Sequence, residues 1–368
     1  MAPRPTKTAK SDADREAAIV SSFLAAQQAA VLEIADQGLI SLARLVETRA
    51  IDVAPKFQRR DRWDAEKQSL LIESFLTNIP VPPVYLAEDI AQLGSYAVID
   101  GKQRLTAISV YFADKLVLRG LTRLGQLNGL RYSQLPVPVQ NALGMKNLRI
   151  TTLLRQSSEE LKHEVFLRLN TGGEVLNPQE IRNVAYRGPL NDLVFTLAEN
   201  PFLRRQFKVI PPLSPNYRQM TDAEFVLRFF ALATSWRDFR GGLREAMDRF
   251  MLENRFADDD RLGRLERSFL SAIETAEAIW GDEAFKRPGR DQALAGMYDA
   301  EMIALAQLRD DQRKVLVQRR GEVQQEVNEL FNQVDFEEAV RRGTNTPSRL
   351  KYRTEALLDV LAAVSELG

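Results

Sequence analysis

The stretch AVIDGKQRLTAISVYF, residues 97–112, joins a short apolar run to a helical pattern through a single glycine. After Gly101, apolar residues recur at Leu105, Ile108 and Phe112, a spacing that is typical of an amphipathic helix. The run before the glycine is short and apolar, as in a buried strand. We therefore expect a buried strand that turns directly into a helix at Gly101.

Two cations fall in the first turn of this expected helix, Lys102 and Arg104. The helix dipole is positive there and disfavours cations. A bound phosphate would remove the conflict, because the unpaired first amides and the dipole both attract anions. Gly101 would let the phosphate approach the backbone, and Arg104 would offer a planar pair of donors. Asp100 is expected to hold Mg²⁺ or to orient Arg104.

The simpler alternative is a strand-to-helix turn with a solvated arginine and lysine. The stretch is neither a Walker A loop nor a G-x-G-x-x-G fingerprint, so the pattern DGKQR alone does not decide between the two interpretations.

The composition excludes several classes of chemistry. The 368 residues suggest about two domains, and the 50 basic and 50 acidic residues give a net charge of zero, so any surface for nucleic acid must be local. The sequence has no cysteine, which excludes disulfides, thiolate nucleophiles and cysteine zinc sites. Its single histidine, His163, excludes on-chain chemistry that needs two histidines, including a His-Asn-His nuclease centre.

The sequence shows no signal peptide and no run of about 18 apolar residues, so we expect a cytoplasmic protein with no membrane segment.

The chain is expected to form an α+β region followed by an all-helical domain. Residues 1–12 are expected to be a disordered tail, and residues 13–48 a helical arm that contains a helix over 13–37. The apolar side of this helix would serve packing or a homodimer. A mixed α/β domain over 49–187 precedes helices over 188–368. Strands and helices alternate too irregularly for a doubly wound sheet.

Two helix starts are predicted from capping residues. Asp64 is a candidate cap for a helix that ends near residue 76. Asn177, with Pro178 at the first helical position and Glu180 as the partner of a capping box, predicts a second start.

Three sequence blocks occur in a fixed order: FQRRDRWDAEKQSLLIESFLTNIPVPPVYL, VIDGKQRLTAI and FLRLNTGGEVLNPQEIRN. Over about residues 50–190 the chain resembles the N-terminal domain family of GmrSD-type restriction endonucleases, which have a ParB/sulfiredoxin-like fold. Lys102 replaces the usual glutamine of the family's DGQQR motif, and Arg60 stands where proline is frequent. The resemblance implies a stand-alone member without the His-Asn-His nuclease domain.

The resemblance also implies that the corner at Gly101 binds nucleotide phosphates, with a nucleoside triphosphate and Mg²⁺ as cofactors. Asp100 and Arg104 are then the expected catalytic residues, and Asp100 the expected Mg²⁺ ligand. The expected nucleotide-binding residues are Gln58, Arg59, Gly101, Lys102, Gln103, Arg104, Arg168 and Asn170. For Gln58 and Arg59 the alternative is a surface cluster, and for Arg168 and Asn170 it is ordinary helix termination.

A second candidate surface lies near the end of the chain. The window 340–353 contains basic residues, a tyrosine and no acid, a composition that suits contacts with the phosphate backbone of DNA. Its candidate DNA-binding residues are Arg341, Arg342, Arg349, Lys351 and Arg353. The alternative is a loop and helix start whose charge is balanced by acids elsewhere.

The sequence favours a nucleotide-binding component of a DNA restriction or anti-phage defence system, with hydrolysis of a nucleoside triphosphate left open. DNA and a separate nuclease subunit are its expected partners. The alternative is a non-enzymatic module that binds or senses DNA and recruits that nuclease.

Overall fold

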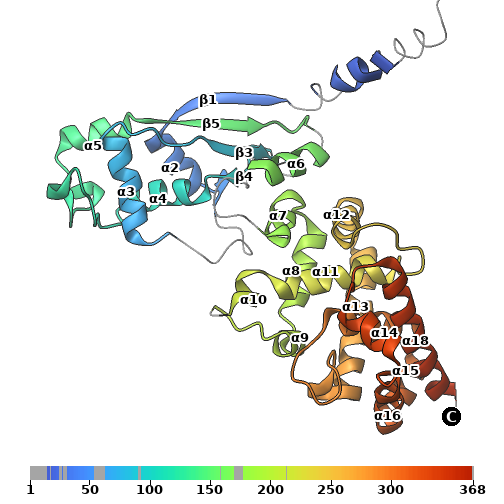
Figure 1. Cartoon of the computed structure of the whole chain (residues 1–368). Helices are drawn as coiled ribbons and strands as arrows, with labels where there is room; N and C mark the ends of the chain where they lie inside the picture. The colour runs from blue at the N-terminus through green and yellow to red at the C-terminus, as the bar shows by residue number, and fades with distance from the viewer. Residues whose placement is uncertain are drawn as a thin grey trace, which may run out of the picture. The chain divides into compact units, whose positions relative to one another are not determined.

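The structure is a computed structural model, shown in Figure 1, and it describes residues 15–16, 18–24, 27, 31–53, 63–89, 93–157, 159–169, 177–212 and 214–366. The chain folds into two compact units, Met1–Leu176 and Asn177–Gly368. We call them the sheet unit and the helical unit. The expected class is confirmed: a mixed α/β region precedes a region built mostly of helices. The tail expected at residues 1–12 lies outside the described residues.

The two compact units divide between Leu176 and Asn177, whereas the domain boundary expected from the sequence lies after residue 187 and stays a prediction. Helix α7 (Pro178–Ala185) packs against α11 (Thr221–Ala233) and α12 (Leu243–Asn254), so its partners belong to the helical unit. The helical unit therefore begins just before α7.

The sheet unit contains a mixed five-stranded sheet. Its strands are β1 (Leu32–Gly38), β2 (Ile51–Asp52), β3 (Val84–Glu88), β4 (Tyr96–Asp100) and β5 (Asn147–Leu153). They lie in the order β1-β5-β3-β4-β2. β1 pairs antiparallel with β5, β5 parallel with β3, β3 antiparallel with β4, and β4 parallel with β2. This order departs from the all-parallel doubly wound pattern, as the irregular alternation of strands and helices predicted.

The helix predicted over residues 13–37 is wrong in its second half. The described residues 18–24 are helical, but Leu32–Gly38 form the edge strand β1, paired along its whole length with β5. The Asp36 carboxylate also accepts hydrogen bonds from the Arg149 guanidinium at 3.0 and 2.9 Å. The hydrogen bonds to β5, a strand far away in the sequence, outweigh the local helical pattern. As a result, Ile34 is 65% exposed and does not pack on a helix face.

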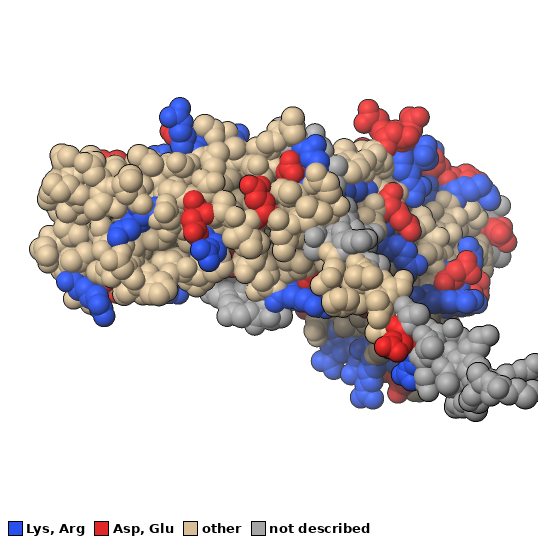
Figure 2. All heavy atoms as spheres, turned by 90° about the horizontal axis from the view of Figure 1, so that it is seen from above, with Lys and Arg blue, Asp and Glu red and all other residues tan. Residues whose placement is uncertain are grey.

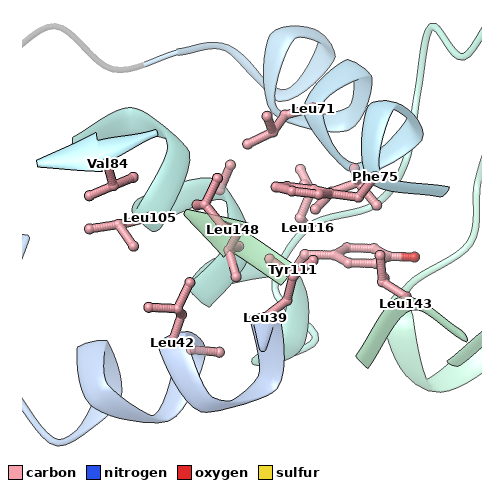
Figure 3. Close-up of a cluster of buried hydrophobic side chains, with 14 of the residues drawn as sticks. Leu39, Leu42, Leu71, Phe75, Val84, Leu105, Tyr111, Leu116, Leu143 and Leu148 are labelled. Carbon is pink, nitrogen blue, oxygen red and sulfur yellow. The ribbon is translucent and has the colours of Figure 1, made fainter. Parts of the chain in front are cut away.

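Helices pack on one face of this sheet and enclose its core. They are α2 (Leu39–Glu47), α3 (Ala65–Leu76), α4 (Lys102–Phe112) and α5 (Val137–Gly144), with short 3-10 turns at Gly125–Leu127 and Tyr132–Gln134. Helix α6 (Glu159–Leu169) lies near β4. Figure 3 shows side chains of the strands, Val84 and Leu148, meeting Leu42 of α2, Leu105 of α4 and Phe75 of α3. Each fully buried leucine or phenylalanine contributes roughly 1.5–3 kcal/mol relative to an exposed one.

Both predicted helix starts are confirmed. The Asp64 carboxylate accepts a hydrogen bond from the N–H of Lys67 at 2.8 Å and caps α3. The Asn177 carbonyl oxygen accepts from the N–H of Glu180 at 2.9 Å, and the Glu180 carboxylate accepts from the N–H of Asn177 at 2.8 Å. Local capping chemistry therefore fixes where these two helices begin.

A buried carboxylate fastens a long loop of the sheet unit to α3. Glu73 is 4% exposed and accepts hydrogen bonds from the backbone N–H groups of Thr122, Arg123 and Leu124 at 3.4, 2.7 and 2.8 Å. Burial alone would raise the pKa of Glu73, but these hydrogen bonds outweigh it and hold the pKa below its usual value. The ionised carboxylate is thus the stabilising form.

We expect Glu73→Ala to lower the free energy of unfolding by roughly 3 kcal/mol at pH 7, because it leaves buried donors without an acceptor. Because the folded-state pKa is depressed, this contribution is present above the unfolded-state pKa of about 4.3 and is lost as the pH falls through the folded-state value. Urea denaturation at pH 7 and at acidic pH should therefore show a mutational effect that shrinks in acid. Glu66→Ala, an exposed change on the same helix, is the control; equal effects of the two changes would contradict the assignment.

The helical unit is built around α14 (Ala295–Gln307), in which every residue from Gly296 to Leu305 is buried. The remaining helices are α8 (Pro189–Ala198), α9 (Pro201–Gln206), α10 (Pro215–Arg218), α13 (Asp259–Trp280), α15 (Asp310–Gln318), α16 (Arg320–Leu330), α17 (Val334–Arg341) and α18 (Pro347–Glu366), with a 3-10 turn at Gly281–Glu283. The central helix α14 packs against α11, α13, α17 and α18, as expected of a helix with no polar face.

Three buried charged side chains connect the central helices of this unit. Asp299 of α14 accepts hydrogen bonds from Arg228 of α11 at 2.5 and 2.6 Å and from Arg353 of α18 at 2.5 Å. The exposed fractions are 1% for Asp299, 5% for Arg228 and 0% for Arg353. One carboxylate therefore serves two guanidinium groups inside the core.

Candidate functional site

The corner at Gly101 has the predicted backbone. β4 ends at Asp100, Gly101 has a φ of 95° in the left-handed region, and α4 begins at Lys102. A Cβ atom at Gly101 would lie 2.5 Å from Cγ2 of Val84 and 3.1 Å from Nη2 of Arg104. Both the backbone conformation and the space available therefore require glycine.

The Arg104 side chain turns inward over this glycine. Its Nη2 donates to Oδ2 of Asp100 at 2.5 Å and to the carbonyl oxygen of Pro83 at 3.1 Å. The Arg104 side chain is 14% exposed and that of Asp100 is 38% exposed. The Nε of Arg104 is buried and has no hydrogen-bond partner among the described residues. Asp100 was expected either to orient Arg104 or to hold Mg²⁺. The hydrogen bond between the two side chains corresponds to the first of these roles.

The charges at the start of α4 come from three side chains and the helix dipole. No side chain caps the helix, and its first turn has no acidic residue. Lys102 and Arg104 supply two positive charges, and Asp100 supplies one negative charge just before the helix. The dipole adds roughly half a positive charge at the same place. Among these groups positive charge exceeds negative charge.

Gln103 connects this helix start to the chain that enters α3. Its Oε1 accepts a hydrogen bond from the N–H of Trp63 at 3.2 Å, and the Gln68 side chain donates to the carbonyl oxygen of Trp63 at 2.7 Å. Gln58 and Arg59 lie outside the described residues, as does Asn170. The described chain that resumes at Trp63 lies directly against the first turn of α4.

The expected site residues divide into two groups. The structure brings Asp100, Gly101, Lys102, Gln103 and Arg104 together at the corner. Arg168 lies on α6, where its side chain is 77% exposed and paired with Glu164. Helix α6 contacts β4, the strand that ends at the corner, so Arg168 lies on an element next to the corner.

Two contacts at the corner were not predicted from the sequence. The Pro83 carbonyl oxygen and the Trp63 N–H both belong to the first of the three sequence blocks, and they are partners of Arg104 and Gln103. The sequence feature that could have indicated these contacts is the first block. Its proline-containing run leads into β3, which pairs with β4.

No cluster of three or more histidine, aspartate or glutamate side chains suited to a metal is found among the residues that the structure describes.

The basic window near the end of the chain is mostly paired. Arg341 bonds Glu337 at 2.9 Å, and the Arg349 guanidinium donates to the carbonyl oxygens of Arg342 and Glu338 at 2.7 and 3.0 Å. Lys351 lies 3.8 Å from Glu355. On the face of the molecule drawn in Figure 2, basic and acidic side chains are interspersed.

The assignment of Arg353 to a DNA-binding surface is wrong. Its side chain is fully buried and bonded to Asp299 and to the carbonyl oxygen of Ala339, because α18 turns this position into the core. Arg341, Arg342, Arg349 and Lys351 remain as the outward-facing candidates.

No helix in the described parts of the chain is both long enough and apolar enough to cross a membrane.

Comparison with known proteins identifies the region around the corner. Residues 42–187 match the family model described as the GmrSD restriction endonuclease, N-terminal domain, and this range contains all three sequence blocks. No curated protein matches the sequence.

Proposed function

We propose that the domain at residues 42–187, which matches the GmrSD restriction endonuclease N-terminal domain of a restriction or defence-related family, binds a nucleotide at the Gly101 corner. Nucleotide binding would make the protein a nucleotide-responsive component of a DNA restriction or anti-phage defence system. A nucleoside triphosphate with Mg²⁺ is the proposed ligand.

The electropositive start of α4 is the observation that supports this proposal. Arg104 is mostly buried beside a helix end that is itself positive, and Asp100 is the carboxylate that pairs with it. A phosphate group would add negative charge at the helix start and offer an acceptor to the buried Nε of Arg104. Asp100 and the Pro83 carbonyl oxygen would hold the guanidinium in position for it.

Hydrolysis of the bound nucleoside triphosphate is a further step of the proposal, beyond binding. Asp100 would have to position water or Mg²⁺ while it also bonds Arg104 at 2.5 Å. That bond is the observation that favours the second candidate function, a non-enzymatic module in which the same corner binds phosphate without turnover. In either case the exposed arginines near residues 341–349 are proposed to meet DNA, and a separate nuclease subunit is proposed to cut it.

Calorimetric titration of ATP, GTP and CTP with Mg²⁺ tests the binding step. We expect Arg104→Ala to weaken binding by about 10- to 150-fold, the equivalent of losing one charged hydrogen-bonding group of roughly 1.5–3 kcal/mol. Arg149→Ala is the matched control, because Arg149 is an exposed arginine of the same unit that also pairs with an aspartate. Equal affinities of wild type and Arg104→Ala would remove the corner from the mechanism.

Phosphate release separates the two candidate functions. Turnover that depends on Arg104 and Asp100 would favour a nucleoside triphosphatase. Nucleotide or DNA binding without release of phosphate, with DNA affinity falling steeply as salt rises, would favour the non-enzymatic module.

A further inference from the structure

The helical unit contains a cavity that the proposed nucleotide corner does not use. An outer groove of about 690 Å³ is lined by residues of the loop 287–290 and of α16 and α17. An inner pocket of about 200 Å³ reaches residues of α13 and α14. The groove and the pocket adjoin each other, since both are lined by Arg287, Pro288, Gln324, Asn328 and Phe331. The groove alone has the size of a small-molecule site, about 300–1,000 Å³.

One side chain that lines the inner pocket has an unsatisfied hydrogen-bond donor. Trp280 lines this pocket and is 7% exposed, and its indole Nε1–H is buried without a partner among the described residues. A buried donor of this kind costs free energy unless an acceptor meets it. An acceptor on a bound ligand would remove that cost.

A buried carboxyl group, that of Glu301, also lines the inner pocket. Glu301 is 1% exposed, and its carboxyl oxygens accept from the N–H of Phe285 at 3.0 and 3.2 Å. Burial raises the pKa of Glu301 well above its usual range, against the opposing hydrogen bond from Phe285. The neutral acid can both donate and accept a hydrogen bond. The inner pocket therefore suits a neutral group with several polar atoms.

The backbone beside the pocket is strained. Phe285 is fully buried and has a φ of 65°, in the left-handed region that is unfavourable for a large side chain. Its carbonyl oxygen accepts from the N–H of Leu294 at 2.7 Å, which closes the loop that carries Arg287 and Arg290. Such strain persists only where the surroundings enforce it, and it gathers at binding sites.

The outer groove offers polar and charged groups of a different kind. The Arg287 guanidinium donates a hydrogen bond to the Glu337 carboxylate at 3.0 Å. For the exposed Arg290, no ion pair is found within the described residues 214–366. The carboxamides of Gln325, Asn328 and Asn332 and the carboxylate of Glu329 complete the polar lining. Carboxamides and a carboxylate suit hydroxyl groups, and an arginine suits a phosphate.

We propose that this site binds a nucleoside monophosphate, with the base in the inner pocket against Trp280 and Glu301, the sugar hydroxyls along the carboxamides, and the phosphate at Arg290. The edge of a base carries acceptors for the Trp280 N–H and polar atoms for the Glu301 carboxyl group. The site is separate from the Gly101 corner in residues and in structural unit, and it does not depend on the function proposed there.

Calorimetry of the full chain with AMP, GMP, CMP and UMP tests this site, with the matching nucleosides and inorganic phosphate as partial probes. At least one monophosphate should bind more tightly than its nucleoside and than phosphate. Arg290→Ala should weaken that binding by about 10- to 150-fold, and Trp280→Phe, which keeps an aromatic ring but removes the N–H, by about two- to tenfold.

Two control variants make the result specific. Arg264→Ala changes an exposed arginine on α13 that does not line the site, and it should leave the affinity unchanged. Arg104→Ala should also leave it unchanged, which separates this site from the corner. Arg290 is exposed, so its variant should fold even if Trp280→Phe does not.

The proposal is overturned if none of the four monophosphates binds at millimolar concentration, or if Arg290→Ala binds as wild type does. Phosphate alone binding as tightly as every monophosphate would also overturn it, because the inner pocket would then contribute nothing.

Discussion

Asp299→Ala should lower the free energy of unfolding by about 3–5 kcal/mol, the cost of breaking a buried ion pair by removing one partner. In this protein the cost should lie at the upper end, because Asp299 serves both Arg228 and Arg353. Without it, two guanidinium groups that are 5% and 0% exposed would remain in the core without their carboxylate. Urea denaturation followed by circular dichroism measures the change.

Asp291→Ala is the matched control for this prediction. Asp291 also pairs with two cations, Lys208 at 3.1 Å and Lys286 at 2.8 Å, but its side chain is 74% exposed. Pairs of this exposed kind contribute about 0–1 kcal/mol. If the two substitutions had similar effects, burial of the Arg228–Asp299–Arg353 group would not be what makes it important.

Gly101→Ala should have the second large effect, a destabilisation of roughly 2–4 kcal/mol. A non-glycine residue in a left-handed conformation costs about 1–3 kcal/mol, and overpacking of a core adds a comparable amount. The new Cβ would meet Cγ2 of Val84 at 2.5 Å and Nη2 of Arg104 at 3.1 Å. It should therefore displace the arginine and weaken nucleotide binding as well as the fold.

Gly94→Ala separates the two contributions. Gly94 also has a positive φ, 77°, but a Cβ there would meet nothing within 4 Å. The control therefore carries the conformational cost alone, and only Gly101→Ala should also impair the corner. Thermal unfolding and nucleotide titration of both variants measure the difference. If Gly101→Ala and Gly94→Ala lowered the stability equally, the close contact between the new Cβ and Val84 would contribute nothing to the destabilisation.

The corner illustrates how far local sequence could predict the candidate site. The apolar run, the glycine and the helical spacing each lie within a few residues, so the strand, the turn and the helix could all be anticipated. The direction of the Arg104 side chain could not, because it depends on Pro83 and Val84 at the start of a neighbouring strand. The sequence thus predicted the strand-to-helix turn but not how the guanidinium is held.

The basic window shows the opposite outcome. Composition alone grouped Arg353 with its exposed neighbours, whereas the packing of α18 against α14 buries it on Asp299. The cavity in the helical unit has no sequence signature either, since its lining comes from separate helices and one loop. Both features depend on which helix faces meet.

The sequence by itself determined the α+β class, the strand-to-helix corner at Gly101 and the helix starts at Asp64 and Asn177. Each of these depends on interactions between residues a few positions apart. Only the tertiary structure decided that Leu32–Gly38 form a strand, that Arg353 lies in the core and that Trp280 and Glu301 line one pocket. Those outcomes come from partners far away in the chain, whose hydrogen bonds and burial outweigh local preference.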